Sequence, residues 1–319
     1  MEIRNLGKSG LRVSVVGLGG NNFGGRIDTE QTRKVVYKAL DVGITLIDTA
    51  DIYAMRGNSE IALGEVLGDR RKDMVLATKF GLKMSDDGVK SGGARRYIVR
   101  AVEDSLRRLK TDYIDLYQIH TPDPLTPQEE TLRALDDLVR SGKVLYIGCS
   151  NHRAWSVVES EWISKSEGLE RYISCQDQYS LLKRDVESEL VPAMVQYGIG
   201  MLPYFPLASG LLSGKHHRNA PQVEGSRLSG QTAFTSIFLT DRNWEITEKL
   251  ESFAQERGHT LLELAFSWLA CRPTVGSIIA GATKIEQVEA NAKAAEWKLT
   301  PEEMAEIDKI APPPPPPGH

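Results

Sequence analysis

The chain has 319 residues, a formal net charge of −4, and 41% hydrophobic and 26% charged residues. This balance is ordinary for a globular protein with a large core, and it gives no reason to expect a nucleic acid or an anionic membrane as a partner. The sequence has no secretion signal, no apolar run of ~18 residues and three cysteines without CxxC or metal-ligand spacing, which predicts a cytoplasmic protein that binds no metal.

Short apolar runs alternate with amphipathic stretches along the chain. The runs are continuously apolar, as in strands buried on both faces of a parallel sheet. The expected strands span residues 12–19, 45–50, 74–80, 114–120, 144–151, 172–179, 199–207 and 275–282. The expected helices span residues 30–42, 60–67, 95–110, 128–141, 153–166, 186–197, 241–257 and 285–297. Eight such strand–helix units close most simply into a single (β/α)8 TIM barrel, an α/β fold.

Other segments fall outside this repeat. Residues 2–11 predict a short hairpin that could plug the N-terminal end of the barrel, and residues 261–272 and 301–310 predict extra amphipathic helices. Residues 207–236 predict a long loop, which is often functional in a compact domain. An open doubly wound sheet is the alternative fold, but no G-x-G-x-x-G follows the first strand. We expect one domain over residues 1–311 and a disordered proline-rich tail over 312–319.

Polar side chains stand where three neighbouring strands end. Asp48 lies at the end of the second expected strand, and Tyr53 follows five residues later. Lys79 and His120 stand at the ends of the third and fourth strands. Each residue alone has a structural explanation, such as a loop cap, an interfacial aromatic or a buried stem. Because barrel active sites lie at the C-terminal ends of the strands, we expect all four side chains to meet at one rim.

These four side chains suit proton transfer beside a carbonyl group. A phenol with a pKa of about 10 exchanges its proton poorly at neutral pH. The ammonium of Lys79 should lower the pKa of Tyr53, and Asp48 should keep Lys79 charged and oriented. His120 can donate a hydrogen bond to a carbonyl oxygen. The sequence therefore predicts a general acid suited to hydride-transfer chemistry, and it lacks the G-x-S-x-G elbow of acyl transfer.

The chain resembles the aldo-keto reductase superfamily over nearly its whole length. The motifs that carry the resemblance, in order, are residues 43–53 with Glu60, 105–109 with 112–117 and His120, 142–144 with 147–151, and 204–215. The first strand and the spacing to Glu60 resemble the bacterial and potassium-channel-β-subunit branch. The resemblance implies a catalytic tetrad of Asp48, Tyr53, Lys79 and His120. It also implies NADP(H)-dependent reduction of aldehydes or ketones to alcohols, or the reverse, with Tyr53 as general acid/base.

The resemblance further implies an NADPH site on the same rim, with NADH possible. Ser150, Asn151 and Gln176 would hydrogen-bond the nicotinamide amide, and Tyr204 would stack on its ring. The loop after the seventh strand would fold over the pyrophosphate, and the start of the last helix suits a phosphate. The other implied positions are Gly20, Asn21, Asp48, Pro206, Leu207, Ser209, Gly210, Leu211, Lys215, Arg227, Gly281, Thr283, Lys284, Gln287 and Asn291. Ala290 stands where many relatives carry Glu, which bears on the preference for NADPH over NADH.

Two other functions remain as alternatives. A regulatory subunit of the channel-β kind would bind NADPH and turn over slowly. An aldolase-type barrel would use Lys79 as a Schiff-base nucleophile, although a nearby Asp48 would keep that amine protonated. The expected partner is a small-molecule carbonyl or alcohol. The sequence leaves its identity, the reaction direction and the oligomeric state open.

Overall fold

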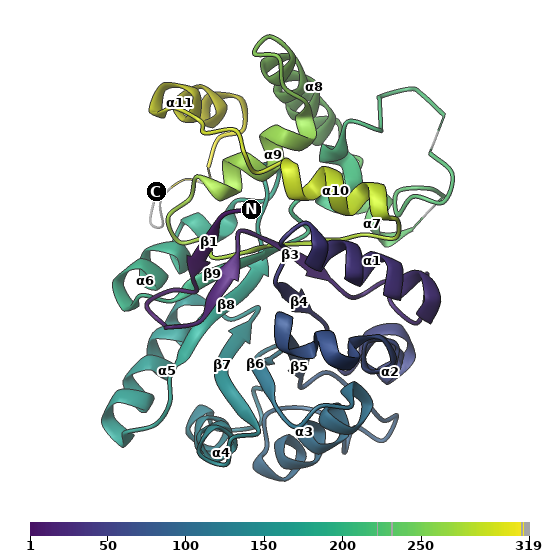
Figure 1. Cartoon of the computed structure of the whole chain (residues 1–319). Coiled ribbons are helices and arrows are strands. Elements are labelled where there is room, and N and C mark those ends of the chain that lie inside the picture. Colours follow the sequence, from purple (N-terminus) through teal and green to yellow (C-terminus); the bar gives the residue numbers. More distant parts are fainter. Residues whose placement is uncertain (222, 231, 314, 316–319) are drawn as a thin grey trace.

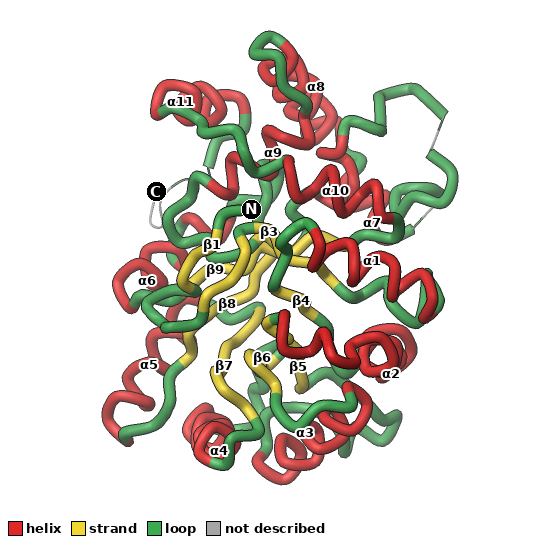
Figure 2. Tube along the Cα trace, viewed as in Figure 1, coloured by secondary structure: helices red, strands yellow, loops and turns green. Residues whose placement is uncertain are grey.

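The computed structural model describes residues 1–221, 223–230, 232–313 and 315. Within them, eight parallel strands form one sheet in the order β10-β3-β4-β5-β6-β7-β8-β9. Figure 1 shows this sheet as the centre of the molecule, and Figure 2 shows the helices arranged around it. The strands are β3 (Val16–Gly19), β4 (Leu46–Asp48), β5 (Val75–Phe80), β6 (Ile114–Ile119), β7 (Val144–Ser150), β8 (Tyr172–Gln178), β9 (Gly200–Tyr204) and β10 (Ile278–Gly281).

Backbone hydrogen bonds bring the two ends of this sheet together. The Met201 amide donates to the Thr274 carbonyl at 2.7 Å, and the Gly276 amide donates to the Met201 carbonyl at 2.9 Å. These bonds join β9 to the segment that leads into β10, so the sheet forms a nearly closed barrel. The predicted (β/α)8 fold is confirmed.

Helices connect successive strands and cover the outside of the barrel (Figure 1). Seven of those that follow a barrel strand are α1 (Thr29–Asp41), α2 (Tyr53–Leu67), α3 (Arg95–Leu109), α4 (Gln128–Arg140), α5 (Ala154–Glu167), α6 (Leu190–Tyr197) and α10 (Ile285–Lys293). After β9 come α7 (Ala233–Phe238), α8 (Asp241–Gln255) and α9 (Leu261–Ala270), and α11 (Pro301–Ile310) lies near the C-terminus. Short 3-10 helices are η1 (Gly68–Asp73), η2 (Asp185–Glu187) and η3 (Ala208–Ser213).

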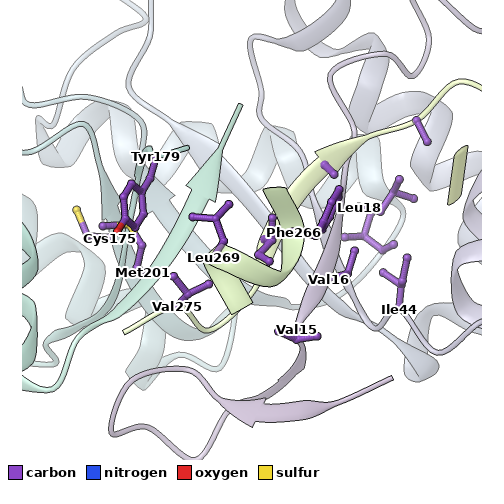
Figure 3. Packing of buried hydrophobic residues seen from close by; sticks show 14 of the residues in the cluster. Val15, Val16, Leu18, Ile44, Cys175, Tyr179, Met201, Phe266, Leu269 and Val275 are labelled. Carbon is purple, nitrogen blue, oxygen red and sulfur yellow. The ribbon is translucent and has the colours of Figure 1, made fainter. Parts of the chain in front are cut away.

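The helix α9 packs directly on the barrel. Figure 3 shows Phe266 beside Val16 and Leu18, and Leu269 toward Met201 and Val275. All of these side chains belong to the main buried cluster, which lies between the strands and the helices. Burying an apolar side chain of this size contributes about 1.5–3 kcal/mol, so α9 helps to hold β3 and β9 in place.

The N-terminal hairpin is longer than predicted. β1 (Ile3–Asn5) pairs antiparallel with β2 (Arg12–Ser14), so the single strand expected over residues 12–19 is two strands, and only β3 belongs to the barrel. The strands separate because the Ser14 hydroxyl donates to the Val16 carbonyl at 2.6 Å and turns the chain between them. Leu6, Leu11 and Val13 pack against residues inside the barrel, so the hairpin plugs its N-terminal end.

The segment expected as a long loop over residues 207–236 also differs. It contains η3 and the start of α7, whose capping box joins Thr232 and Thr235. Of the predicted tail, residues 314 and 316–319 lie outside the described residues. No helix in the described part of the chain is long and apolar enough to cross a membrane.

Candidate active site

Three adjacent strands deliver the predicted catalytic side chains to one end of the barrel. Asp48 is the last residue of β4, Lys79 lies near the end of β5, and His120 follows β6. The Gly20 amide donates to the Asp48 carbonyl at 2.7 Å, and the His120 amide donates to the Phe80 carbonyl at 2.8 Å. The parallel ladder therefore continues past the strand ends and fixes the backbone from which these side chains project.

The side chains of Asp48, Tyr53 and Lys79 form one hydrogen-bonded group. The Lys79 ammonium donates to Asp48 Oδ2 at 2.6 Å, to the Thr49 carbonyl at 3.0 Å and to the Tyr53 hydroxyl at 3.4 Å. Lys79 is fully buried. An ammonium in such a position needs a charged partner, and Asp48 supplies it. The geometry thus connects a carboxylate, an ammonium and a phenol in a row.

Two amides hold the second oxygen of the Asp48 carboxylate. Gln176 Nε2 donates to Asp48 Oδ1 at 2.9 Å, and Gln118 Nε2 donates to the same oxygen at 3.3 Å. Gln118 was not among the site residues predicted from the sequence. The strand periodicity could have predicted it, because residues two apart on a strand share a face and Gln118 precedes His120 by two. Asp48 therefore links Lys79 to Gln176, a predicted nicotinamide ligand.

The pKa values of Lys79 and Tyr53 reflect this burial. Burial by itself lowers the pKa of Lys79, but the nearby Asp48 charge and the contacts with Tyr53 outweigh it, so the pKa is raised and the amine stays charged. Burial raises the pKa of Tyr53, and the Lys79 charge lowers it only in part. Lys79 therefore lowers the pKa of Tyr53 as expected, but burial outweighs this effect and the net shift is upward. Lys79 still reduces the energy needed to form a buried phenolate.

His120 lies beside the phenol and is uncharged at neutral pH. Its ring centroid is 5.7 Å from that of Tyr53, in an edge-to-face arrangement. Burial, followed by the charge of Lys79, lowers the pKa of His120 to about 3. The ring atom Nδ1 is buried and has no hydrogen-bond partner within the described residues. A neutral imidazole carries one N–H donor, which suits hydrogen bonding to a carbonyl oxygen next to Tyr53.

A cavity of about 570 Å³ opens above this group. Its lining includes Tyr53 and His120 of the predicted tetrad, whereas Lys79 lies below the surface. Leu211 and Lys284 are not among the lining residues: Leu211 packs in the core, and Lys284 is an exposed residue at the start of α10. The other predicted cofactor positions all line the cavity, namely Gly20, Asn21, Asp48, Ser150, Asn151, Gln176, Tyr204, Pro206, Leu207, Ser209, Gly210, Lys215, Arg227, Gly281, Thr283, Gln287 and Asn291.

The predicted nicotinamide ligands are bonded to one another. The Ser150 hydroxyl donates to the Gln176 carbonyl at 2.7 Å, and the Tyr204 hydroxyl donates to Asn151 Oδ1 at 2.7 Å. Asn151 Nδ2 donates to the His120 carbonyl at 2.9 Å. Asn151 holds a left-handed backbone conformation, with φ at 60°, which Asn tolerates better than most residues. These contacts fix the amide and hydroxyl groups that face the cavity next to His120.

Cationic side chains from separate loops also line the cavity. Burial, and then the charge of Arg26, lower the pKa of Arg227, so two guanidinium groups repel each other across this space. Lys215 and His216 line the same region. The Ser209 hydroxyl is buried there without a partner in the described chain. Converging cations and a free hydroxyl fit an anionic group such as a pyrophosphate.

The N-terminal turn of α10 completes this part of the cavity. Gln287 Oε1 accepts hydrogen bonds from the Thr283 amide at 2.8 Å and the Thr283 hydroxyl at 3.2 Å. Glu286 and Ala290 line the cavity one helical turn apart. Glu286 and His216 were not predicted from the sequence as residues of the site, although His216 directly follows Lys215. The cationic side chains and the Ser209 hydroxyl suit a phosphate, so the residues present fit a dinucleotide.

Comparison with known proteins identifies the family. The profile of the "Aldo/keto reductase family" matches residues 15–312. The chain belongs to the aldo/keto reductase family. This aldo/keto reductase is 35% identical to a probable voltage-gated potassium channel subunit beta of Oryza sativa, over 97% of this chain and 96% of the relative. It is 35% identical to the L-glyceraldehyde 3-phosphate reductase of Escherichia coli K12, over 97% and 92%. It is 36% identical to an uncharacterized oxidoreductase of Bacillus subtilis, over 98% and 97%.

The family resemblance found in the sequence is thus confirmed, and with it the broad class of an oxidoreductase. Members of this family generally use a nicotinamide cofactor. The roles of the individual residues in this aldo/keto reductase remain predictions, and the geometry above is what supports them.

Proposed function

We propose that this chain reduces aldehydes or ketones to alcohols with NADPH, or catalyses the reverse reaction, with Tyr53 as general acid/base. The observation that carries the proposal is the row Asp48–Lys79–Tyr53, joined by contacts of 2.6 and 3.4 Å, at the floor of a cavity that His120 also lines. The cationic groups Arg26, Lys215 and Arg227 in the lining of the cavity support a phosphate-bearing cofactor. The extra 2′-phosphate of NADPH suits this charge.

The chain's own residues can carry out the proton part of the reaction. When bound, the nicotinamide supplies the hydride. Tyr53 is protonated at neutral pH and gives its proton to the carbonyl oxygen, and the Lys79 ammonium stabilises the phenolate that remains. His120, being neutral, donates a hydrogen bond that orients the same oxygen. Asp48 holds Lys79 in place and charged throughout.

The same geometry opposes a Schiff-base mechanism. An amine must lose its proton to attack a carbonyl carbon. The Asp48 carboxylate lies 2.6 Å from the Lys79 nitrogen and raises its pKa, so the amine is held in its unreactive form. Borohydride should therefore trap no adduct on Lys79.

The proposal is tested by mixing the protein with NADPH or NADH and a panel of aldehydes and ketones. The panel includes L-glyceraldehyde 3-phosphate, because a relative is named for its reduction. We expect Tyr53→Phe to lower kcat by about 10²–10⁴-fold, which is the usual contribution of a positioned proton donor. The matched control is Tyr37→Phe, which removes a hydroxyl bonded to the Val66 carbonyl on the outer helices.

Full turnover in Tyr53→Phe would refute the proposed role of Tyr53. Tight NADPH binding with hardly any turnover in the unmodified protein would instead support the alternative of a regulatory subunit. Faster turnover with NADH than with NADPH would correct the cofactor assignment alone.

A further inference from the structure

A buried hydrogen bond lies behind the turn that carries Tyr53. The Tyr97 hydroxyl donates to Asp51 Oδ2 at 3.1 Å. Asp51 is 1% exposed and Tyr97 is 7% exposed, and neither lines the cavity. Asp51 Oδ1 has no hydrogen-bond partner in the described parts of the chain. Tyr97 is therefore the one side-chain donor that the structure assigns to this carboxyl group.

Asp51 is tied to both members of the proposed proton-donating pair. It precedes Tyr53 by two residues, and its backbone amide donates to the Lys79 carbonyl at 3.0 Å. Its side chain points to the outer side of the barrel, where Tyr97 stands in the first turn of α3. The bond between Asp51 and Tyr97 thus joins the β4–α2 connection to a helix that does not otherwise take part in the site.

The chain on the other side of Tyr53 is strained. Ala54, Met55 and Arg56 have φ values of 51°, 64° and 64°, in the left-handed region that residues with a Cβ atom disfavour. Met55 is 88% exposed. The ion pair between Arg56 and Asp86, at 2.6 Å, is on the surface and so stabilises this turn little. A firm attachment before Tyr53 is therefore needed to hold its phenol in position.

The surroundings of Asp51 leave Tyr97 as its side-chain donor in the described chain, beside the backbone amide of Ile52. Glu60 of α2 is already bonded to Arg108 of α3 at 2.6 Å and to Thr78 of β5 at 2.6 Å. That arrangement pairs Arg108 with Glu60, so Asp51 is left without an ion-pair partner among the described residues. Burial, and then the charge of Glu60, raise the pKa of Asp51 to about 7, while the hydrogen bond from Tyr97 and the charge of Arg108 lower it.

Tyr117 of β6 also faces this group and stays protonated, because burial and the charges of Asp51 and Glu60 raise its pKa.

We propose that Asp51 and Tyr97 are positioning residues, whose hydrogen bond fixes the β4–α2 turn so that the Tyr53 phenol stays within reach of Lys79. This inference rests on the proposed reductase function. A phenol donates a stronger hydrogen bond to a carboxylate than to a carboxylic acid. Ionisation of Asp51 therefore tightens the turn, and kcat rises as the pH passes through about 7. Neither residue touches the substrate.

The test compares the pH dependence of kcat, from about pH 5.5 to 8.5, in matched variants. Tyr97→Phe removes the donor, and we expect kcat at neutral pH to fall about tenfold, which corresponds to one hydrogen bond. The inflection near pH 7 should be lost, because without the Tyr97 hydroxyl the ionisation of Asp51 no longer changes how firmly the turn is held. Asp51→Asn keeps an acceptor for Tyr97, so it should retain kcat within about threefold and lose the inflection.

Two further measurements separate positioning from general damage. The KM for the aldehyde and the Kd for NADPH, measured by fluorescence, should stay within about twofold of those of the unmodified protein in both variants. Tyr37→Phe removes a tyrosine hydrogen bond of the same 3.1 Å length between α1 and α2, and it should leave kcat and its pH profile unchanged.

Hydrogen–deuterium exchange gives a readout that does not need turnover. Amides over residues 51–58 should exchange faster in Tyr97→Phe than in the unmodified protein, with no change in the same segment of Tyr37→Phe. Unchanged exchange over this segment, or an unchanged pH profile in both Asp51→Asn and Tyr97→Phe, would overturn the inference. Absence of turnover in the unmodified protein would instead count against the proposed function, and the exchange result would still decide the positioning role.

Discussion

The two parts of the cavity are built in different ways. At the proton-transfer end, Asp48, Lys79 and Tyr53 lie at the ends of strands or directly after them, and their polar atoms bond one another in the interior. At the phosphate end, Arg227 and Lys215 come from the segment after β9, and cationic groups face the cavity and repel one another. The first arrangement is complete in the protein alone, whereas the cationic side chains of the second are ones that a bound anion would neutralise. Substitutions at the two ends should therefore separate catalysis and stability from cofactor affinity.

The largest effect is expected for Lys79→Met, which leaves Asp48 buried without a cation. Breaking a buried ion pair in this way costs about 3–5 kcal/mol of unfolding free energy. We also expect kcat to fall by about 10²–10⁴-fold, because the phenolate of Tyr53 loses its stabilising charge. Urea unfolding and steady-state kinetics measure the two effects.

The control for that variant is Lys143→Met, which removes a surface ion pair with Glu103. Its unfolding free energy should change by less than about 1 kcal/mol. A Lys79→Met protein as stable as this control would contradict the idea that the proton-transfer end is held together by buried charge.

A second prediction distinguishes buried carboxylates with and without a cation. Burial raises the pKa of Asp177 to about 7, and its hydrogen-bond partner is the Cys175 thiol at 2.9 Å. A raised pKa in the folded state means that stability present below pH ~4 is lost as the pH rises through about 7. Between pH 4 and 8 the ionisation of Asp177 should lower the unfolding free energy by up to about 4 kcal/mol, and we expect this decrease to be absent in Asp177→Asn. Urea unfolding at several pH values measures the slope.

Asp112→Asn, at an exposed position, is the control and should leave the pH slope unchanged. A slope that stays the same in Asp177→Asn would mean that this carboxyl group does not titrate near neutral pH. Asp51 contributes to the slope with the same sign, so some pH dependence should remain in the Asp177 variant.

Substitutions at the phosphate end should change the affinity for NADPH. Arg227 donates to Asn21 Oδ1 at 2.8 Å and to Asn22 Oδ1 at 3.0 Å, next to the cavity. We expect Arg227→Met to raise the Kd for NADPH by about 10–100-fold, the range for one hydrogen bond to a charged group. The value of kcat at saturating NADPH should stay within about threefold. Fluorescence titration measures the affinity.

Arg242→Met, on the exposed surface of α8, should leave the Kd for NADPH unchanged. A loss of kcat in Arg227→Met as large as in Lys79→Met would remove the distinction between the two ends of the cavity.

The smallest effect is expected at the start of α10. Glu286 places a carboxylate on the cavity wall, where it would repel the 2′-phosphate of the proposed NADPH. Glu286→Gln should therefore improve the Kd for NADPH relative to that for NADH by about 2–5-fold, since solvent screens much of the repulsion. Glu289→Gln is the control, because Glu289 pairs with Lys38 of α1. An equal change for both cofactors would place Glu286 away from the 2′-phosphate.

The sequence by itself determined the architecture and the residues of the proton-transfer end. Continuous apolar runs separated by amphipathic helices predict a parallel barrel, and the side chains that end its strands must then meet at one rim. That Asp48, Lys79 and His120 lie close together could be predicted from the sequence, because they end neighbouring parallel strands and such strands are only about 4.8 Å apart. The division of residues 12–19 into β2 and β3 could not be predicted, because one apolar run covers both the hairpin strand and the barrel strand.

Only the tertiary structure decided the electrostatics and the loops. The pKa of Tyr53 depends on how much water its phenol loses, and burial outweighed the nearby ammonium that the sequence already indicated. Arg26 and Arg227 stand far apart in the chain, and only the folded structure shows that they face the same space. The bond between Asp51 and Tyr97 likewise joins residues that are 46 positions apart in the sequence. Spacing along a strand encodes which side chains share a face, but desolvation and contacts between distant loops arise only when the chain is packed.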